Sequence, residues 1–216
     1  MSIDFYAGSG SPYAWRVWLA LEHKALPYNL RMMSFDSGDL KKPEFLTLNP
    51  RGKVPVVVDN GLAVYESAAV LEYLDDAYPK SGEALFPRNV KSRATARRLV
   101  READQYLAHA MEGLVELIFF TPGDEWNAAA IAQAKDKFLG ELPLFERELK
   151  GDFFCDGPGA VDFTVYPILA LVLRIEVKYP PLGVRAAISP KLGEWMRRVE
   201  AQPYFAKTYP PHWKKT

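Results

Sequence analysis

The chain has 216 residues, its 27 Lys and Arg balance its 27 Asp and Glu, and 49% of its residues are apolar. This balance lacks the positive excess typical of nucleic-acid binding, and the chain is too apolar for disorder. One cysteine and three scattered histidines exclude a disulfide framework and a metal-ligand pattern, and no apolar run is long enough to span a bilayer. We therefore expect no metal, no nucleic-acid partner and no membrane span. The start of the chain has no basic segment before an apolar one, which favours a cytoplasmic protein.

The first 79 residues alternate between strand and helix patterns. Residues 3–7 are an apolar run that ends in a G-S-G-S turn. Pro12 then opens an amphipathic helix that Pro27 ends, and residues 28–33 form a second strand. The polar residues 34–44 read as a connection.

A hairpin and a helix complete this half of the chain. Two β-rich runs, residues 54–58 and 62–65, flank the turn Asp59-Asn60-Gly61, which is a strong hairpin signal. Glu66 and Ser67 lead into a helix that stops before Pro79. The order of elements predicts an α/β domain over residues 1–79, with helices covering a sheet.

The rest of the chain reads as helical. Residues 80–89 are polar and rich in turn formers, which indicates a linker before an all-α domain over residues 90–216. Its helical segments include residues 128–150, interrupted by Pro143, and residues 161–178, which are apolar all round as in a buried central helix.

The informative motif is S-P-Y-A-W-R, residues 11–16, which follows the first strand and opens the first helix. Free N–H groups and the helix dipole stabilise an anion at such a terminus. Redox proteins with C-x-x-C there use this field to lower a cysteine pKa. Ser11 and Ala14 fill both cysteine positions, so disulfide exchange at this site is excluded. The Ser11 hydroxyl can still donate to the thiolate of another molecule, which favours a thiol cosubstrate.

Three motifs in order resemble the cytosolic glutathione transferase family. They are the serine motif at residues 11–16, N-P-R-G-K-V-P at residues 49–55, and E-S at residues 66–67. The motifs are similar to those of the serine-type classes (theta, zeta, tau or omega-like, bacterial or plant). The S-P-Y-A-W-R segment also resembles that of the omega class, which has Cys at the first position. The resemblance implies a thioredoxin-like first domain, an all-α second domain, glutathione as cosubstrate, a homodimer and a role in detoxification.

The resemblance also implies the glutathione contacts. Ser11 is the expected catalytic hydroxyl that holds the sulfur. Val54 pairs its backbone with the cysteinyl part of glutathione, and the peptide bond before Pro55 is expected to be cis. The expected glutathione-binding set is Lys42, Lys53, Val54, Pro55, Glu66 and Ser67. Lys41 competes with Lys42 for the glycyl carboxylate.

Several residues have competing interpretations. Ser9 and Tyr6 are alternatives to Ser11 as the hydroxyl. We expect Arg16 to have a structural role in bridging the two domains. Cys155 is interpreted as an inert apolar residue, and His23 is expected to lie on a solvated helix end.

The sequence shows the least pattern where the electrophile pocket and the buried cap of the second domain are expected. Pocket candidates are Tyr13, Tyr106, Met111 and Tyr166, although helical spacing equally predicts that they pack in the core. Asp162 resembles the acid of the family's buried capping box, where Gly159 replaces the usual Ser or Thr.

The expected reaction is attack of the glutathione thiolate on an electrophilic small molecule. Alternatives are a glutathione-dependent isomerase like maleylacetoacetate isomerase, a β-etherase or a dehalogenase. Pro12 and Tyr13 stand where the isomerase class has Ser and Cys, which disfavours it. A binding or assembly module that kept the fold but lost the chemistry is the non-enzymatic alternative, and the intact motifs disfavour that as well.

Overall fold

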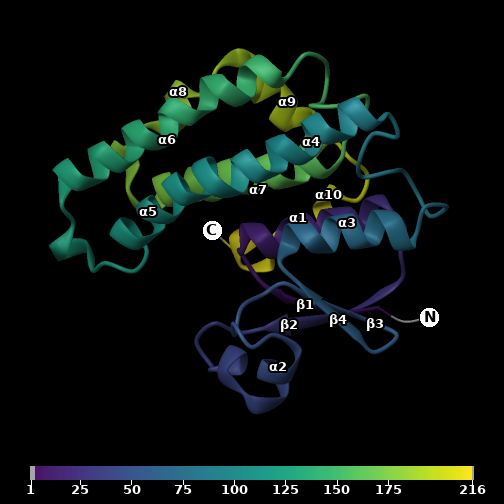
Figure 1. Cartoon of the computed structure of the whole chain (residues 1–216). Coiled ribbons are helices and arrows are strands. Elements are labelled where there is room, and N and C mark those ends of the chain that lie inside the picture. The colour runs from purple at the N-terminus through teal and green to yellow at the C-terminus, as the bar shows by residue number, and fades with distance from the viewer. Residues whose placement is uncertain (1–2, 216) are drawn as a thin grey trace. The chain divides into compact units, whose positions relative to one another are not determined.

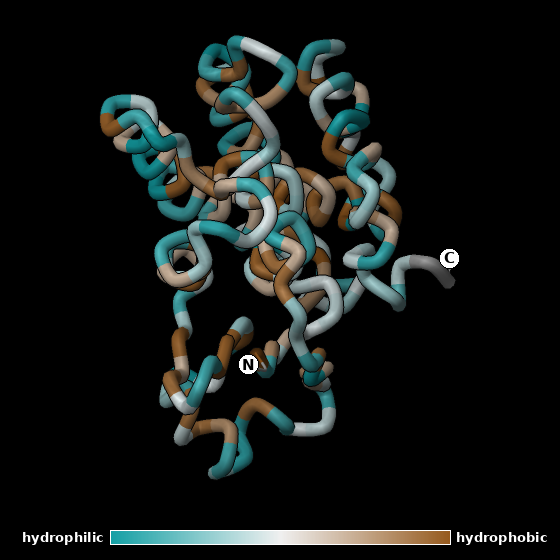
Figure 2. The backbone as a smooth tube through the Cα atoms, turned by 90° about the vertical axis from the view of Figure 1, so that its right-hand side faces the viewer, coloured by the Kyte–Doolittle hydropathy of each residue, from teal (hydrophilic) through white to brown (hydrophobic). Residues whose placement is uncertain are grey.

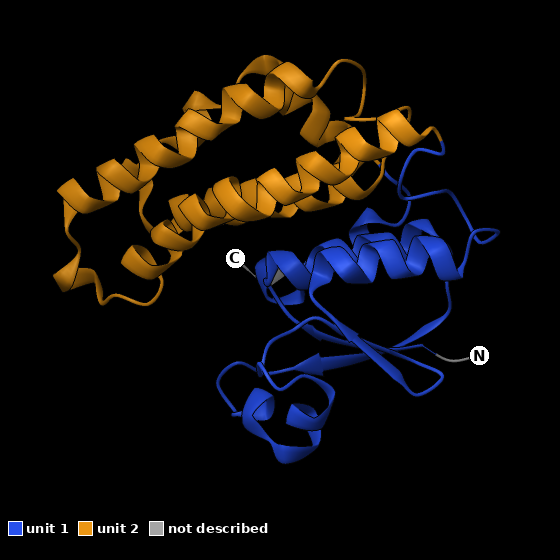
Figure 3. Ribbon diagram, in the orientation of Figure 1, with its two compact units in different colours: residues 1–88, 202–216 blue, residues 89–201 orange. Residues whose placement is uncertain are grey.

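The computed structural model describes residues 3–215. Met1 and Ser2, which begin the segment predicted to be no secretory signal, lie outside the described residues, as does Thr216. The chain forms two compact units (Figure 3). The first contains the residues up to Arg88 and the segment from Gln202 onward, and the second is Asn89–Ala201. The sequence predicts that the carboxyl-terminal segment belongs to the helical domain. It groups with the first unit instead.

The first unit contains a four-stranded mixed sheet in the order β2-β1-β3-β4. Its strands are β1 (Ile3–Gly8), β2 (Tyr28–Met33), β3 (Val56–Asp59) and β4 (Leu62–Tyr65). β1 runs parallel to β2 and antiparallel to β3, and Tyr6 lies opposite Arg31 on one side and Val56 on the other. Asn60 and Gly61 join β3 to β4 with φ of 49° and 86°, which matches a hairpin turn with two left-handed residues.

Helices cover both faces of this sheet (Figure 1). α1 (Pro12–His23) and α3 (Ser67–Ala77) lie side by side on one face, and α2 (Pro43–Leu48) lies on the other. The short 3-10 helix before α2 (Asp39–Lys41) falls in the polar connection predicted over residues 34–44. α2 starts at the end of that connection and continues through a stretch for which the sequence predicted no element. Within α2 only Phe45 is buried, so the segment carries too little apolar pattern to be recognised. The predicted α/β domain is confirmed.

The carboxyl end of α1 is buried, so the prediction of a solvated end around His23 is wrong. His23 is 8% exposed, and its Nδ1 lies 2.9 Å from the hydroxyl of Tyr204. Burial lowers the pKa of this imidazole. The next residue, Lys24, is 1% exposed and pairs with Asp75 at 3.2 Å. Gly82, at φ +53°, lies so close to the backbone of His23 and Lys24 that a Cβ built on it would be 2.5 Å from their atoms. The loop after α3 therefore packs directly on the end of α1.

The second unit is all helical, as predicted. It comprises α4 (Val90–Glu102), a π-helical turn (Ala103–Leu107), α5 (Ala108–Ile118), a 3-10 helix (Gly123–Glu125), α6 (Ala128–Glu148), α7 (Ala160–Lys178), a 3-10 helix (Pro180–Leu182), α8 (Val184–Ala187) and α9 (Pro190–Glu200). α7 is largely buried, with α4 and α5 against it. The tube is brown, or hydrophobic, toward the middle of this unit and alternates with teal in the outer helices (Figure 2). Within residues 3–215, no helix combines the length and apolarity needed to cross a membrane.

Pro143 does not interrupt α6, contrary to the sequence prediction. Proline removes one helical hydrogen bond, at a cost of about 3 kcal/mol in a helix interior. The side chains of Phe138, Leu142 and Phe145 are nevertheless buried on either side of it, with exposures of 0–5%. Burying each of them contributes about 1.5–3 kcal/mol, so packing outweighs the lost hydrogen bond.

Asp162 organises the amino terminus of α7. One carboxylate oxygen accepts from the backbone N–H of Gly159 at 3.1 Å, and the other accepts from Trp195 Nε1 at 2.7 Å and from the N–H of Phe154 at 3.2 Å. Gly159 has no side chain, so only the acid half of a capping box exists here. Complete burial raises the pKa of Asp162 to about 6, although all three donors favour the charged form.

Candidate active site

Ser11 caps the first helix, and its hydroxyl proton remains available. The residue has extended backbone angles (φ −70°, ψ 120°), and its Oγ accepts from the N–H of Ala14 at 3.2 Å, while Pro12 takes the first helical position. The cap uses an oxygen lone pair, so the O–H can donate to a ligand at the positive end of α1. The half-buried Ser11 side chain therefore lies where an incoming anion is stabilised.

The two alternative hydroxyls have other contacts. A hydrogen bond of 2.6 Å joins Ser9 Oγ to His212 Nδ1. The ring of Tyr6 packs against Phe45 of α2, with centroids 5.9 Å apart. Neither residue is the N-cap of α1, the position that Ser11 takes at the positive end of the helix dipole.

The Val54–Pro55 peptide bond is cis, as predicted. β3 pairs with β1 only from Val56 onward, so the backbone of Val54 stands outside the sheet ladder and can accept an added strand. The preceding turn is held by Asn49, which is 2% exposed and was not singled out from the sequence. Its amide donates to the carbonyl of Lys53 at 2.7 Å and accepts from the N–H of Arg51 at 3.0 Å.

Ser67 begins α3 and is linked to α1 through a buried arginine. Arg16, 3% exposed, donates from Nε to Ser67 Oγ at 2.9 Å, and its guanidinium lies 5.4 Å from the ring centroid of Tyr13. This bond joins two helices of the first unit. The preceding residue, Glu66, is exposed with φ 66°, a conformation that non-glycine residues rarely adopt. The start of α3 therefore combines free N–H groups, a strained residue and a nearby cation, as in an anion-binding site.

Lys42 already has an anionic partner. Its Nζ lies 2.7 Å from Asp39 Oδ1, and this ion pair raises the pKa of Lys42 and lowers that of Asp39 to about 2. Lys42 borders a groove of about 510 Å³ between β2 and α2, together with Tyr6 and Phe45. The ammonium can meet a ligand carboxylate only by sharing or exchanging Asp39.

The expected pocket residues separate into two kinds. Met111 and Tyr166 are 1% and 2% exposed, and the Tyr166 hydroxyl donates to Glu200, so both pack in the core, which agrees with the alternative interpretation of their helical spacing. Tyr13 is half-buried beside the arginine already described. Tyr106 is 50% exposed on the π-helical turn.

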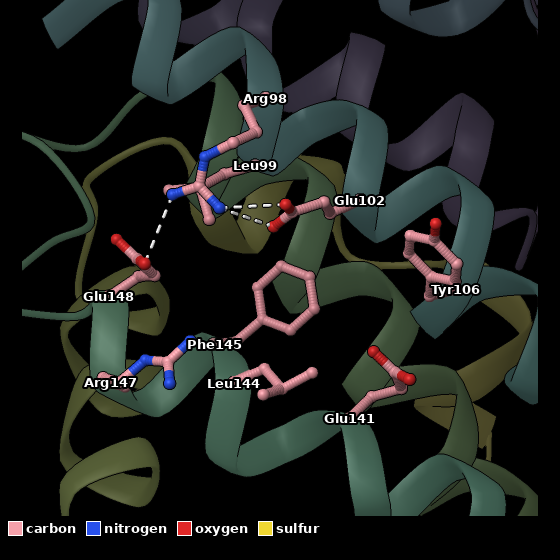
Figure 4. Close-up of a pocket in the computed structure, with 9 residues that line it drawn as sticks. All are labelled: Arg98, Leu99, Glu102, Tyr106, Glu141, Leu144, Phe145, Arg147 and Glu148. Atoms are coloured by element: carbon pink, nitrogen blue, oxygen red, sulfur yellow. Dashed lines mark hydrogen bonds and ion pairs between the residues drawn. The ribbon is translucent and has the colours of Figure 1, made fainter.

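Tyr106 borders a hollow of about 230 Å³ between α4 and α6 (Figure 4). Phe145 and Leu144 supply its apolar wall, and Arg98 bridges Glu102 and Glu148 at one end. The hollow therefore combines an apolar floor with a charged rim inside the helical unit.

Cys155 is a poor nucleophile, which agrees with its interpretation as an inert residue. Burial, with the nearby charges of Asp162 and Asp156, raises its pKa to about 11. At neutral pH almost no thiolate is present, so any thiolate chemistry must come with a ligand.

Comparison with known proteins identifies the two halves independently. The profile of the glutathione S-transferase N-terminal domain matches residues 10–77, and that of the C-terminal domain matches residues 128–198. Glutathione S-transferase A of Pleuronectes platessa is 28% identical over 95% of this chain and 90% of its own. The crystal structure of a glutathione S-transferase from Laternula elliptica has a TM-score of 0.76 at 29% identity, covering 100% of this chain and 95% of its own. The fold is shared with a glutathione transferase of Burkholderia graminis that has two glutathione molecules bound per subunit (TM-score 0.84, 22% identity, 97% and 88% covered).

Proposed function

The chain belongs to the glutathione S-transferase family, and from that premise we propose that Ser11 holds and activates the glutathione sulfur for attack on an electrophilic carbon. The observation that carries this proposal is the cap geometry of Ser11. Its Oγ accepts from Ala14 and so keeps a proton for donation, at the positive end of α1.

Thiolate stabilisation follows from elementary electrostatics. A free thiol has a pKa near 8.5, so a small fraction is ionised at neutral pH. A hydroxyl donor and a helix terminus lower such a pKa by about one to two units, each unit worth about 1.4 kcal/mol. The sulfur then forms a bond to the electrophilic carbon. In a substitution the leaving group departs with its electron pair, and in an addition the neighbouring atom takes a proton.

The remaining contacts support glutathione as the thiol. The backbone of Val54, before cis-Pro55, is free of the sheet ladder and suits antiparallel pairing with a short peptide. Ser67 accepts from Arg16 and therefore keeps its own proton for the γ-glutamyl carboxylate, at the start of α3 beside Glu66. Lys42 would contact the glycyl carboxylate in exchange for Asp39.

The test is Ser11→Ala with an aryl halide as electrophile. We expect kcat/KM to fall about 10- to 100-fold, because the variant loses one hydrogen bond to a charged group. The affinity for glutathione should change little. Ser11→Thr keeps both hydroxyl and cap and should retain most activity.

The chain offers a matched control for the lost cap. Ser189, followed by Pro190, caps α9 with the same geometry, its Oγ accepting from Leu192 N–H at 3.2 Å. Ser189→Ala should destabilise the protein as much as Ser11→Ala, about 1 kcal/mol, without changing kcat/KM. An unchanged rate in Ser11→Ala would remove Ser11 from the mechanism.

Family membership also supports a cytoplasmic homodimer with a role in detoxification. Sedimentation equilibrium tests the dimer, and a monomer at micromolar concentration would contradict it. Turnover of a panel of electrophiles tests the breadth of substrates.

A further inference from the structure

The carboxyl-terminal segment, residues 205–213, docks along α1 within the first unit (Figures 1 and 3). It contains α10 (Phe205–Thr208) and leads into a 3-10 helix (Pro211–Lys215). Lys207 pairs with Glu22 at 2.6 Å near the end of α1. The segment then runs back toward the beginning of the helix, which carries Ser11.

Trp15 anchors the segment at the start of α1. Its Nε1 donates to Thr208 Oγ1 at 3.0 Å, and the two side chains are 2% and 0% exposed. Tyr209 and Trp213 meet the Trp15 ring edge to face, with centroids 5.7 Å and 5.5 Å away. Such buried aromatic contacts fix geometry as well as burying area, so His212, between these anchors, has a defined position.

His212 contacts the turn that carries the proposed catalytic serine. Its Nδ1 lies 2.6 Å from Ser9 Oγ. Gly10, at φ +83°, lies so close that a Cβ built on it would be 2.8 Å from His212 Cε1. Glycine at this position thus permits both the backbone conformation and the approach of the imidazole. The next residue is Ser11.

We propose that His212 is a positioning residue, which acts through Ser9 to hold the Ser9-Gly10-Ser11 turn where Ser11 meets the glutathione sulfur. This rests on the proposed role of Ser11. The cap bond to Ala14 fixes Ser11 from the helix side. The His212–Ser9 bond fixes the same turn from the strand side. A hydroxyl whose turn is held from both sides stays in position when a ligand binds, so less free energy is needed to orient it.

The decisive measurement is the pKa of the glutathione thiol bound to the full-length protein, followed by ultraviolet absorbance of the thiolate. We expect His212→Ala to raise this pKa by about half a unit to one unit and to lower kcat/KM about two- to tenfold, as for one ordinary hydrogen bond. The glutathione KM should change less than twofold. His212→Asn, which places an amide at the Nδ1 position, should restore both values, whereas His212→Gln, which places it near Nε2, should not.

Coupling and stability controls separate positioning from simple anchoring. If Ser9 carries the effect, Ser9→Ala should match His212→Ala, and the double variant should be no worse than either. Lys207→Met removes the ion pair at the far end of the segment and should leave the thiol pKa unchanged. Thermal unfolding of each variant reports any loss of docking.

An unchanged thiol pKa in His212→Ala would overturn the inference, and so would effects of the Ser9 and His212 variants that multiply. If Ser11→Ala is impaired while His212→Ala behaves as wild type, the positioning role alone fails. If Ser11→Ala itself is unimpaired, the proposed function fails first.

Discussion

Asp162→Asn tests whether burial or hydrogen bonding controls the ionisation of the carboxylate that caps α7. Burial raises its pKa from 3.8 to about 6, while Trp195 and two backbone N–H groups donate to it and act in the opposite direction. The two effects predict opposite dependences of stability on pH, so one variant distinguishes them.

The sign and size follow from proton linkage. A native pKa of about 6 against 3.8 means that the folded protein binds more protons than the unfolded chain over that interval. The contribution of Asp162 to the free energy of unfolding is therefore full below about pH 4 and is lost as the pH rises through about 6. The difference of about 2.2 units corresponds to a loss on the order of 3 kcal/mol.

The assay is urea unfolding of wild type and Asp162→Asn from about pH 4 to about pH 7, at one protein concentration, with tryptophan fluorescence as the signal. The amide cannot ionise, and its NH₂ faces donors, so the variant should be less stable by about 1–3 kcal/mol at the low end. The advantage of the wild type should then shrink by about 3 kcal/mol as the pH rises. A constant advantage would mean that the three donors balance burial, and a growing one that they outweigh it; in either case the native pKa is not raised.

Three further predictions concern an ion pair, the cysteine and two glycines. Asp75→Asn leaves Lys24 charged without its partner in a site 1% exposed, so it should cost about 3 kcal/mol or more in urea unfolding; a loss under about 1 kcal/mol would contradict a buried pair. Cys155, with its pKa raised to about 11, should react with a disulfide reagent at neutral pH far more slowly than free cysteine, and Cys155→Ser should keep full conjugation activity. Gly82→Ala should lower the unfolding temperature more than Gly61→Ala. Both positions have positive φ, which costs a non-glycine residue about 1–2 kcal/mol, but of the two only Gly82 would place a Cβ 2.5 Å from backbone atoms. Equal effects of the two substitutions would refute the clash.

The helix start and the hairpin of the first unit were predicted well from the sequence, because each forms through residues that are neighbours in the chain. The start of α1 follows from Ser11 and Pro12, whose cap and fixed φ need no distant partner. The β3–β4 hairpin follows from Asn60-Gly61, since few residues adopt its two left-handed conformations. The motif resemblance added the cis bond before Pro55.

Helix continuity depended on packing that no local pattern reports. Pro143 reads as a break, yet α6 continues because buried neighbours offset the lost hydrogen bond. α2 was missed for the opposite reason, since only Phe45 of its short sequence reaches the core. Met111 and Tyr166 show the same ambiguity, because one helical periodicity describes both a pocket wall and a core.

The sequence by itself determined the class of fold, the order of the four strands with α1 and α3, and the chemistry of a serine at a helix amino terminus. These properties arise from backbone preferences and from contacts within a few residues. Only the tertiary structure decided what surrounds that serine. It brings His212 to Ser9 across 203 positions of the chain and Arg16 to Ser67 across 51. Contacts at such separations leave no spacing in the sequence, because they form only when packing brings distant segments together. For His212, aromatic burial folds the end of the chain back onto α1.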